Sequence, residues 1–395
     1  MDINQPLTLL GGITPSQFMQ KYWQRKPLLI RQAIPDFKHT LSIADIRKLV
    51  RREEVESQLV WREANVWQMK AGPHSRLPAA TQSGWTLLAQ NVSLHDDATA
   101  ALMHQFRFIS DARLDDATIS IATDGGGVGP HFDSADVFLL QAHGTCRWRI
   151  SQQKGLSLEP GLPLNILANF QPDEEYVIEP GDMLYLPPHV AQDGVALGDS
   201  MTISIGCRAP TQATLACGLL EAANDQIMAN LGAPKGMYSY PVIKGPELSA
   251  TYKDRGIAAT DAPASMPQSL IDATLAAISK VRFDSALASR FLGQWLTDLP
   301  ENAYFAPGDD IPDITGGLPK TGRITLDRCT RMMYRERELF INGEVAPVGA
   351  TKTLRQLADD RELPCHAPAS RRLSEAELET LLAWLDDGWA HYHED

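Results

Sequence analysis

The sequence predicts an α+β protein whose core is an antiparallel β roll, and three observations lead to that prediction. A β-rich run at 118–123 enters a glycine cluster at 125–129 and leaves it for a second apolar run at 137–140. A later stretch, 179–189, has the pattern of turn, short apolar strand and turn. The longest helical pattern, at 211–230, comes after these β-rich segments. Strands followed by helices are typical of the α+β class.

Length and composition set the broad class. A chain of 395 residues is long enough for two or three domains, and 44% hydrophobic with 22% charged residues is ordinary globular composition. No apolar run has the length of a membrane span, and the first residues lack the pattern of a signal peptide. Five cysteines without a C-x-x-C pair favour a reduced, cytoplasmic protein without structural zinc.

The formal net charge of -13 disfavours direct binding of nucleic acid, because phosphate recognition needs clustered lysines and arginines. It suits a basic protein partner, such as the tail of a ribosomal protein. Acidic charge that serves solubility alone explains the same number equally well.

The N-terminal elements follow from caps and periodicity. Thr14 and Ser42 are N-cap residues for two short helices, and Pro15 stands at a first helical position. We expect helices at 13–25, 41–50 and 97–106 and strands at 26–31, 58–70 and 85–92, with a loop at 71–84. These elements build or cover the β core, and none is assigned chemistry.

The candidate site begins at His131 and Asp133. Residues i and i+2 of a strand point the same way, so the imidazole and the carboxylate share one face. Such a pair supplies two arms of the 2-His-1-carboxylate triad of non-haem Fe(II) oxygenases. His-x-Asp also occurs often by chance, as a solvated strand end. The preceding glycines, which allow a sharp turn, and the stretch 179–189 favour a double-stranded β-helix (jelly roll, cupin), which returns a third ligand beside the first two.

The rest of the predicted roll follows the site. We expect strands at 137–141, 146–150 and 200–207 and a turn at 142–145 that carries His143 on the surface. The strand at 200–207 closes the first domain.

The C-terminal half is predicted to be helical and then mixed. We expect helices at 211–230, 270–280 and 284–298, with a structured linker at 231–268 after the first and a second linker at 301–322 that leads to a small final unit. Asn342-Gly343 predicts a hairpin over 340–345, and a capping box at Ser374 opens a helix expected to run to about Tyr392. Helix, hairpin and helix together resemble a winged helix with a structural or docking role.

A resemblance to a known family rests on several segments. They include Tyr22-Trp-Gln-Arg-Lys-Pro-Leu-Leu-Ile-Arg31, Gly125-Gly-Gly-Val-Gly-Pro-His-Phe-Asp133 and Glu179-Pro-Gly-Asp-Met-Leu-Tyr-Leu-Pro-Pro188, with shorter matches at 90–92, 136–138, 148–149 and 206–210. With these, the sequence resembles the bacterial JmjC-type ribosomal oxygenases, which are 2-oxoglutarate/Fe(II) hydroxylases of an arginine in a large-subunit ribosomal protein. The similarity covers nearly the full chain.

The resemblance implies an architecture, cofactors and partners. It implies a JmjC/cupin domain over 1–210, a helical dimerisation region over 211–305 and a winged-helix-like unit over 306–395. It also implies Fe(II) and 2-oxoglutarate as cofactors, a homodimer in the cytoplasm, and a ribosomal protein as the basic partner.

The metal ligands implied by the resemblance are His131, Asp133 and a second histidine. Gln192 stands at the position expected for that histidine, and His189 lies three residues earlier, in the turn. Three possibilities follow: His189 swings in through an altered turn, Gln192 ligates weakly through its carbonyl oxygen, or the third arm is absent. We favour the last, because an offset of three residues normally changes both the face and the depth of a side chain.

The positions that the resemblance implies for the co-substrate and the target also differ. The cation that would anchor the distal carboxylate of 2-oxoglutarate is replaced by Cys146. Arg147 is adjacent but is expected on the other face, unless the register slips. Ser120 offers a nearby hydroxyl. Asp116 matches an acidic contact for the target arginine, and Ala135 stands where an aromatic ring would stack on it.

Three functions compete at this point. The first is a working Fe(II)/2-oxoglutarate hydroxylase with metal on His131, Asp133 and His189. The second is a non-catalytic descendant that keeps the pocket, the dimer and the surface for a basic partner, and acts as a binding or assembly factor. The third is a jelly-roll enzyme that uses another metal.

Overall fold

The computed structural model describes residues 2–306, 308, 311–314, 316–368 and 370–394. The chain divides into two compact units, residues 1–209 and 210–395, and each is described by itself. The boundary lies beside the predicted one at residue 210. The predicted further division between residues 305 and 306 falls inside the second unit and stays a prediction.

The first unit opens with capped helices that cover the β core. Thr14 and Ser42 each close a capping box, at the start of α1 (Pro15–Lys21) and of α2 (Ile43–Leu49), as predicted. The third helix, α3 (Asp97–His104), is capped by the Asp96 side chain. Phe18 and Ile46 of the first two helices are fully buried in the hydrophobic core.

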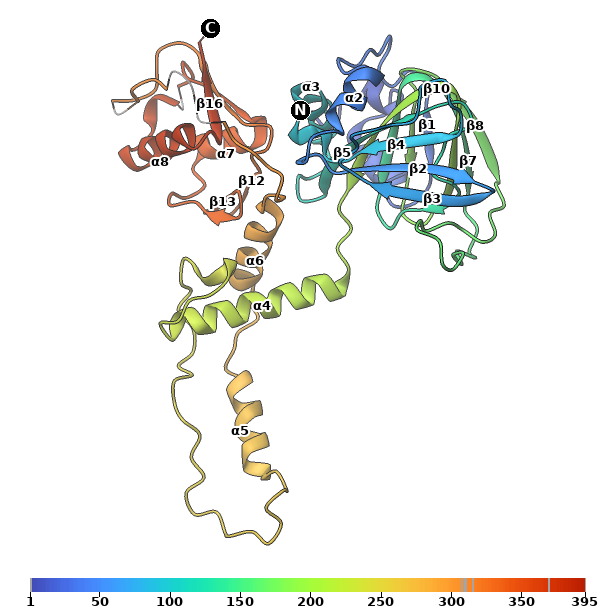
Figure 1. Ribbon diagram of the computed structural model, residues 1–395. Helices are drawn as coiled ribbons and strands as arrows, with labels where there is room; N and C mark the ends of the chain where they lie inside the picture. The colour runs from blue at the N-terminus through green and yellow to red at the C-terminus, as the bar shows by residue number, and fades with distance from the viewer. Residues whose placement is uncertain (1, 307, 309–310, 315, 369, 395) are drawn as a thin grey trace. The chain divides into compact units, whose positions relative to one another are not determined.

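One antiparallel sheet rolls up to form that core (Figure 1). Its main path runs β1-β9-β7-β10-β5-β4-β2-β3, with β6 paired to β10 and β8 paired to β7. The strands are β1 (Leu28–Ile30), β2 (Ser57–Glu63), β3 (Val66–Ala71), β4 (Trp85–Ala89), β5 (Leu114–Ala122), β6 (His131–Phe132), β7 (Val137–Ser151), β8 (Glu174–Ile178), β9 (Met183–Leu186) and β10 (Ala191–Cys207). The prediction of a double-stranded β-helix core is confirmed.

Strand alternation separates an apolar face from a polar cavity face. On β5, Ala117, Ile119 and Ile121 are buried in the core, whereas Thr118 and Ser120 line a cavity. Residues directly opposite each other in neighbouring strands point the same way. The register Ser120↔Thr202 therefore places a second hydroxyl in that cavity.

Several strand boundaries differ from the predictions. The run 58–70 is a hairpin of β2 and β3 that turns at Ala64 and Asn65, both at positive φ. The turn was not predicted because it lacks the usual Asn-Gly pair. The predicted turn at 142–145 is wrong: β7 continues through it, and Gly144 keeps a positive φ close to the backbone of Asp199. His143 is exposed there, as predicted. The strand β8 was missed, and β10 begins at Ala191 rather than at 200.

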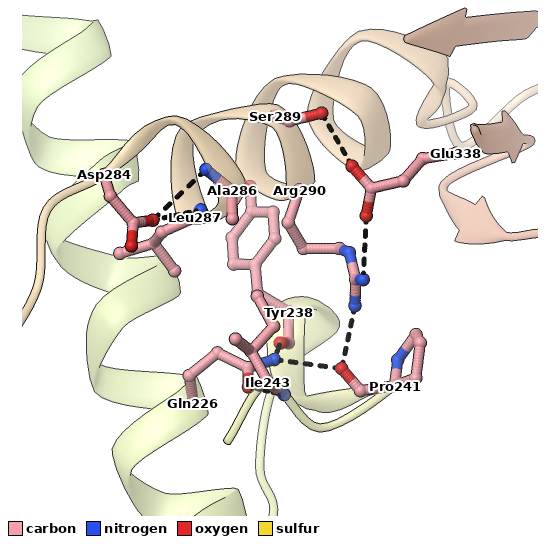
Figure 2. Close-up of polar contacts among 10 residues, drawn as sticks. All are labelled: Gln226, Tyr238, Pro241, Ile243, Asp284, Ala286, Leu287, Ser289, Arg290 and Glu338. Carbon is pink, nitrogen blue, oxygen red and sulfur yellow. Dashed lines mark hydrogen bonds and ion pairs between the residues drawn. The ribbon is translucent and has the colours of Figure 1, made fainter. Parts of the chain in front are cut away.

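The second unit begins with helices. These are α4 (Gln212–Asn230), α5 (Gln268–Ile278) and α6 (Ser285–Thr297), capped at Thr211 and Asp284 in the first and last cases. The Gln226 side chain of α4 bonds the backbone of Tyr238 and of Ile243, so α4 holds the segment after it (Figure 2). No described helix is long and apolar enough to cross a membrane.

The Arg290 guanidinium joins α6 to two other parts of this unit (Figure 2). It donates to the Pro241 carbonyl at 2.7 Å and to the Glu338 carboxylate at 3.0 Å. The arginine side chain is 9% exposed and that of Glu338 34%. Loss of the carboxylate would therefore leave a largely buried charge without its counter-ion.

We expect Glu338→Ala to lower the free energy of unfolding by about 2 kcal/mol, less than for a fully buried pair because Glu338 is partly solvated. Urea unfolding followed by tryptophan fluorescence measures this. Glu362→Ala is the matched control, because the Arg323–Glu362 pair is 43% and 47% exposed. Equal effects of the two substitutions would contradict the assignment.

The C-terminal part holds two three-stranded sheets and two further helices. They comprise β11 (Arg323–Leu326), β12 (Met332–Arg335), β13 (Glu338–Ile341), β14 (Glu344–Val345), α7 (Lys352–Asp360), β15 (Glu362–Pro364), α8 (Glu375–Asp386) and β16 (Ala390–His393). The predicted hairpin is confirmed, with Asn342 and Gly343 both at positive φ. The capping box at Ser374 is confirmed as well. The helix stops at Asp386 rather than near Tyr392, because Gly388 turns the chain into β16.

Candidate functional site

A cavity of about 390 Å³ lies inside the β roll of the first unit. Its size is typical of a small-ligand site. Seven of the predicted site residues line it, namely Asp116, Ser120, His131, Asp133, Ala135, Cys146 and Gln192. His189 and Arg147 are not among its lining residues.

The glycine cluster brings the chain past the cavity at close range. A Cβ atom on Gly127 would lie 2.4 Å from the carbonyl oxygen of Gly194 in β10, and Gly129 has a φ of +79°. Side chains at these positions would push the loop off β10 or strain the backbone. The cluster therefore allows the chain to bring His131 alongside β10.

His131 is oriented in the manner of a metal ligand. Its Nδ1 lies 2.9 Å from the Gly129 carbonyl oxygen, which can only accept, so Nδ1 carries the proton. In the neutral ring the lone pair is then on Nε2, and His131 lines the cavity. A backbone carbonyl behind a ligating histidine is a common way to fix the tautomer.

Gln192 stands beside these two residues. It pairs with His131 in the β10–β6 register, and its Nε2 donates to Asp133 Oδ2 at 2.6 Å. The side chain is 2% exposed, and its Oε1 has no hydrogen-bond partner within the described part of the protein. The position predicted for the third ligand is thus occupied by an amide that currently bonds the carboxylate.

His189 lies elsewhere. It is exposed in the turn before β10, at a φ of +65°, and its backbone N–H donates to the Asp133 carbonyl. Its ring is 5.7 Å from that of Phe132, the neighbour of His131 that points to the opposite face. The structure does not bring the predicted set of His131, Asp133 and His189 together: no three His, Cys, Asp or Glu side chains among the described residues could hold a metal ion.

Two residues of the site, His131 and Asp133, fit the requirements of a metal ion. His131 Nε2 and the Asp133 carboxylate are suitable ligands for iron or a similar divalent ion. The third donor would be the Gln192 amide oxygen, which is uncharged. A metal held here would supply Lewis-acid and redox chemistry at the cavity.

The cavity does not fit 2-oxoglutarate in the same way. Cys146, which stands where the resemblance implies a cation, lines the cavity; burial, assisted by Asp193, raises the pKa of its thiol to about 12, so it is uncharged. No lysine or arginine is among the cavity-lining residues that the structure describes. In the β7–β10 register Cys146 opposes Ala196 inside, whereas Arg147 opposes Val195 on the outer face, so the expected register is confirmed.

Ser120 lines the cavity as predicted, and its hydroxyl lies 3.4 Å from the Thr202 carbonyl oxygen. A hydroxyl can bond a carboxylate but cannot neutralise it. The described lining of the cavity therefore offers hydrogen bonds but no lysine or arginine.

Aspartates give the cavity its charge. Besides Asp133, the lining includes Asp115, Asp116 and Asp136. Asp115 is bonded to Arg208 at 2.9 Å, and Asp136 faces Arg113 at 3.5 Å. Asp116 accepts a hydrogen bond from the Thr118 hydroxyl at 2.7 Å and takes part in none of the ion pairs found between described residues.

Burial raises the pKa of Asp116, and Asp115 adds to the effect, whereas the Thr118 hydroxyl opposes it. An acid with a raised pKa gains most from a cationic ligand, because the cation restores its charged form.

Ala135 lies in the same lining and leaves space rather than a stacking ring. Thr86 and Trp148 also line the cavity and were not predicted to do so; strand alternation places Trp148 on the same face as Cys146, two residues away.

The double-stranded β-helix with its inward His-x-Asp pair agrees with the sequence comparisons. Residues 101–215 match the JmjC domain family, and residues 280–391 match the ROXA-like winged helix family. The chain thus contains a JmjC domain and a ROXA-like winged helix.

Individual relatives agree with these two domain matches. The ribosomal protein uL16 3-hydroxylase of Escherichia coli is 36% identical over 207 residues, which is 52% of this chain and 55% of that protein. The alignment thus spans about half the length of that relative. The probable ribosomal oxygenase of Haemophilus influenzae is 29% identical over 96% of both chains. The structure of E. coli YcfD, a ribosomal oxygenase, in complex with cobalt and 2-oxoglutarate matches at a TM-score of 0.76 with 25% identity, covering 96% of this chain and 98% of that one.

Proposed function

We propose that this ribosomal-oxygenase homologue binds a basic, arginine-bearing segment of a large-subunit ribosomal protein in its JmjC cavity, with the hydroxylation chemistry of the family impaired. The observation that carries the proposal is the charge of the cavity. Four aspartates line it without a lysine or arginine in the described lining, and the Asp116 carboxylate takes part in no described ion pair.

A guanidinium group is the natural partner of such a carboxylate. Its planar array of donors can bond one carboxylate with two parallel hydrogen bonds. Asp115 and Asp136 already face arginines of this chain, and Asp133 accepts a hydrogen bond from Gln192 beside His131. We therefore assign the incoming guanidinium to Asp116. Ribosomal protein uL16 is the substrate named for the E. coli relative, and it is the first partner to test.

Two substitutions support the impaired chemistry. The metal position has an amide at Gln192 in place of an imidazole, and the co-substrate position has an uncharged thiol at Cys146 in place of a cation. The metal ion would have a weaker ligand in the Gln192 amide, and the distal carboxylate of 2-oxoglutarate would have no cationic partner at Cys146.

The family reaction itself is the second candidate, namely 2-oxoglutarate/Fe(II)-dependent hydroxylation of an arginine. The observation that favours it is the geometry of His131 and Gln192. The imidazole keeps the carbonyl contact of a metal ligand, and the Gln192 Oε1 is a buried acceptor with no partner among the described groups. In that case His131, Asp133 and Gln192 would hold the metal.

We expect Asp116→Asn to weaken binding of purified uL16 by about tenfold or more, because a charge-assisted hydrogen bond is replaced by a neutral one. Isothermal titration calorimetry with the full chain measures this. Asp115→Asn is the matched control, since its carboxylate is already paired with Arg208. Binding that is indifferent to Asp116, or weakened equally by both substitutions, would exclude the assigned contact.

The same contact predicts a pH dependence. A bound guanidinium favours the ionised carboxylate, so the affinity should be greatest above the raised pKa of Asp116 and fall as the pH drops through it. Asp116→Asn should remove this component of the pH profile, whereas Asp115→Asn should retain it.

Oligomeric state and location are part of the proposal. Helix α5 has no buried residue, and Leu270, Ile271, Leu275 and Ile278 are 40–60% exposed, which suits a dimer interface. We place the homodimer in the cytoplasm with its ribosomal partner, and assign it no direct contact with nucleic acid because of its net charge of -13.

A further inference from the structure

The interior of the roll holds three buried polar atoms that the proposed peptide contact does not use. They are Thr86 Oγ1, Trp148 Nε1 and Gln192 Oε1, and none has a hydrogen-bond partner within the residues described. Their residues are 4%, 8% and 2% exposed and all line the cavity. Leaving such groups unpaired is costly, so a site that keeps three of them is built for a ligand or for water.

The fold brings these groups to one region. The loop after β5 lies close to both β4 and β10. A Cβ on Gly126 would lie 2.4 Å from the carbonyl oxygen of Trp85, the residue before Thr86 in β4. A Cβ on Gly127 would lie 2.4 Å from the carbonyl oxygen of Gly194 in β10. Gly194 in turn packs on the Trp148 ring, because a Cβ atom on Gly194 would lie only 2.8 Å from that ring.

The chemistry of the trio defines the class of ligand. Trp148 can only donate, the Gln192 oxygen can only accept, and the Thr86 hydroxyl can do either. Cys146 and Ser120 add uncharged groups, and Asp133 adds a negative one. A carboxylate brought here would lose its hydration without gaining a cation, whereas an amide would meet both a donor and an acceptor.

We propose that this inner part of the cavity, formed by Thr86, Trp148 and Gln192, binds a small uncharged carboxamide-type molecule rather than a dicarboxylate. The ligand carbonyl accepts from Trp148 Nε1 and its N–H donates to Gln192 Oε1. This assignment is independent of peptide binding at Asp116. A titration that monitors the Trp148 signal and one that measures uL16 binding therefore test the two proposals separately, and either can be negative while the other is positive.

Succinamide and succinate provide the test, because they share a skeleton and differ in charge. The full chain is labelled with 5-fluorotryptophan, its eight tryptophans are observed by ¹⁹F NMR, and Trp148→Phe assigns the relevant signal. Succinamide should shift the Trp148 signal saturably. Succinate and 2-oxoglutarate should bind at least about tenfold more weakly, because a carboxylate without a partner is costly to bury.

Two variants sharpen the result. Thr86→Val, which keeps the shape and removes the hydroxyl, should weaken succinamide severalfold. Cys146→Arg should reverse the preference toward succinate, whereas Cys146→Met, which adds bulk without charge, should not. Equal or tighter binding of succinate to the parent chain, or no saturable shift with succinamide, would overturn the proposal; the second outcome would mean that water satisfies the three atoms.

Discussion

Replacing Gln192 by histidine should raise the affinity of the chain for a divalent metal ion by about a hundredfold or more, because a complete ligand set replaces two strong ligands and one weak one. The residue is placed for this. It opposes His131 in the β10–β6 register and lies within 2.6 Å of an Asp133 oxygen. Histidine there would supply a second imidazole lone pair and would release Asp133 from the amide.

Cobalt(II) titration followed by visible absorption, with the intact chain, measures this affinity. His189→Ala is the control, since His189 is exposed and outside the cavity lining, and it should leave the affinity unchanged. Gln192→Leu tests the amide oxygen, because any contribution from Oε1 to metal binding disappears with it. Unchanged affinity in Gln192→His, or a loss in His189→Ala, would show that the third arm has been misplaced.

Cys146→Arg should raise the affinity for 2-oxoglutarate by about a hundredfold, since a buried carboxylate then gains a charged partner. Cys146 is 5% exposed and shares the inner face of β7 with Trp148. An arginine at this point would direct its guanidinium into the cavity, where none of the described lining residues is cationic.

Calorimetry with 2-oxoglutarate, in a chain that also carries Gln192→His and is loaded with cobalt, measures the gain. Cys146→Met in the same background controls for bulk. Arg147→Gln should have little effect, because Arg147 opposes Val195 on the outer face of the sheet. Tight binding of 2-oxoglutarate before Cys146 is changed would mean that another group anchors its distal carboxylate.

Much of the site could be predicted because local rules determine it. His131 and Asp133 share a face through strand alternation, and the same alternation placed Cys146 inside and Arg147 outside. Gln192 was selected through the family resemblance, which implies a histidine a few residues after Pro187-Pro188; in the structure it pairs with His131 of β6.

The remainder depends on contacts between distant parts of the chain. Ion pairs determine which aspartates of the cavity are neutralised: Arg113 pairs with Asp136, and Arg208 pairs with Asp115. The two residues of the second pair are 93 positions apart in the sequence. No local pattern encodes such pairs. The turn at Ala64 and Asn65 was missed for a related reason: alanine rarely adopts a positive φ, and the pairing of β2 with β3 holds Ala64 there.

The central claim is that the cavity retains recognition of a basic segment but lacks two groups required by the family reaction. Incubation of the parent chain with Fe(II), 2-oxoglutarate and uL16, followed by intact-mass spectrometry and a succinate assay, tests it most directly. We expect uL16 to bind without a gain of about 16 Da, the mass of one oxygen atom transferred by an oxygenase of this class, and without succinate. Stoichiometric hydroxylation of uL16 by the parent chain would contradict the account.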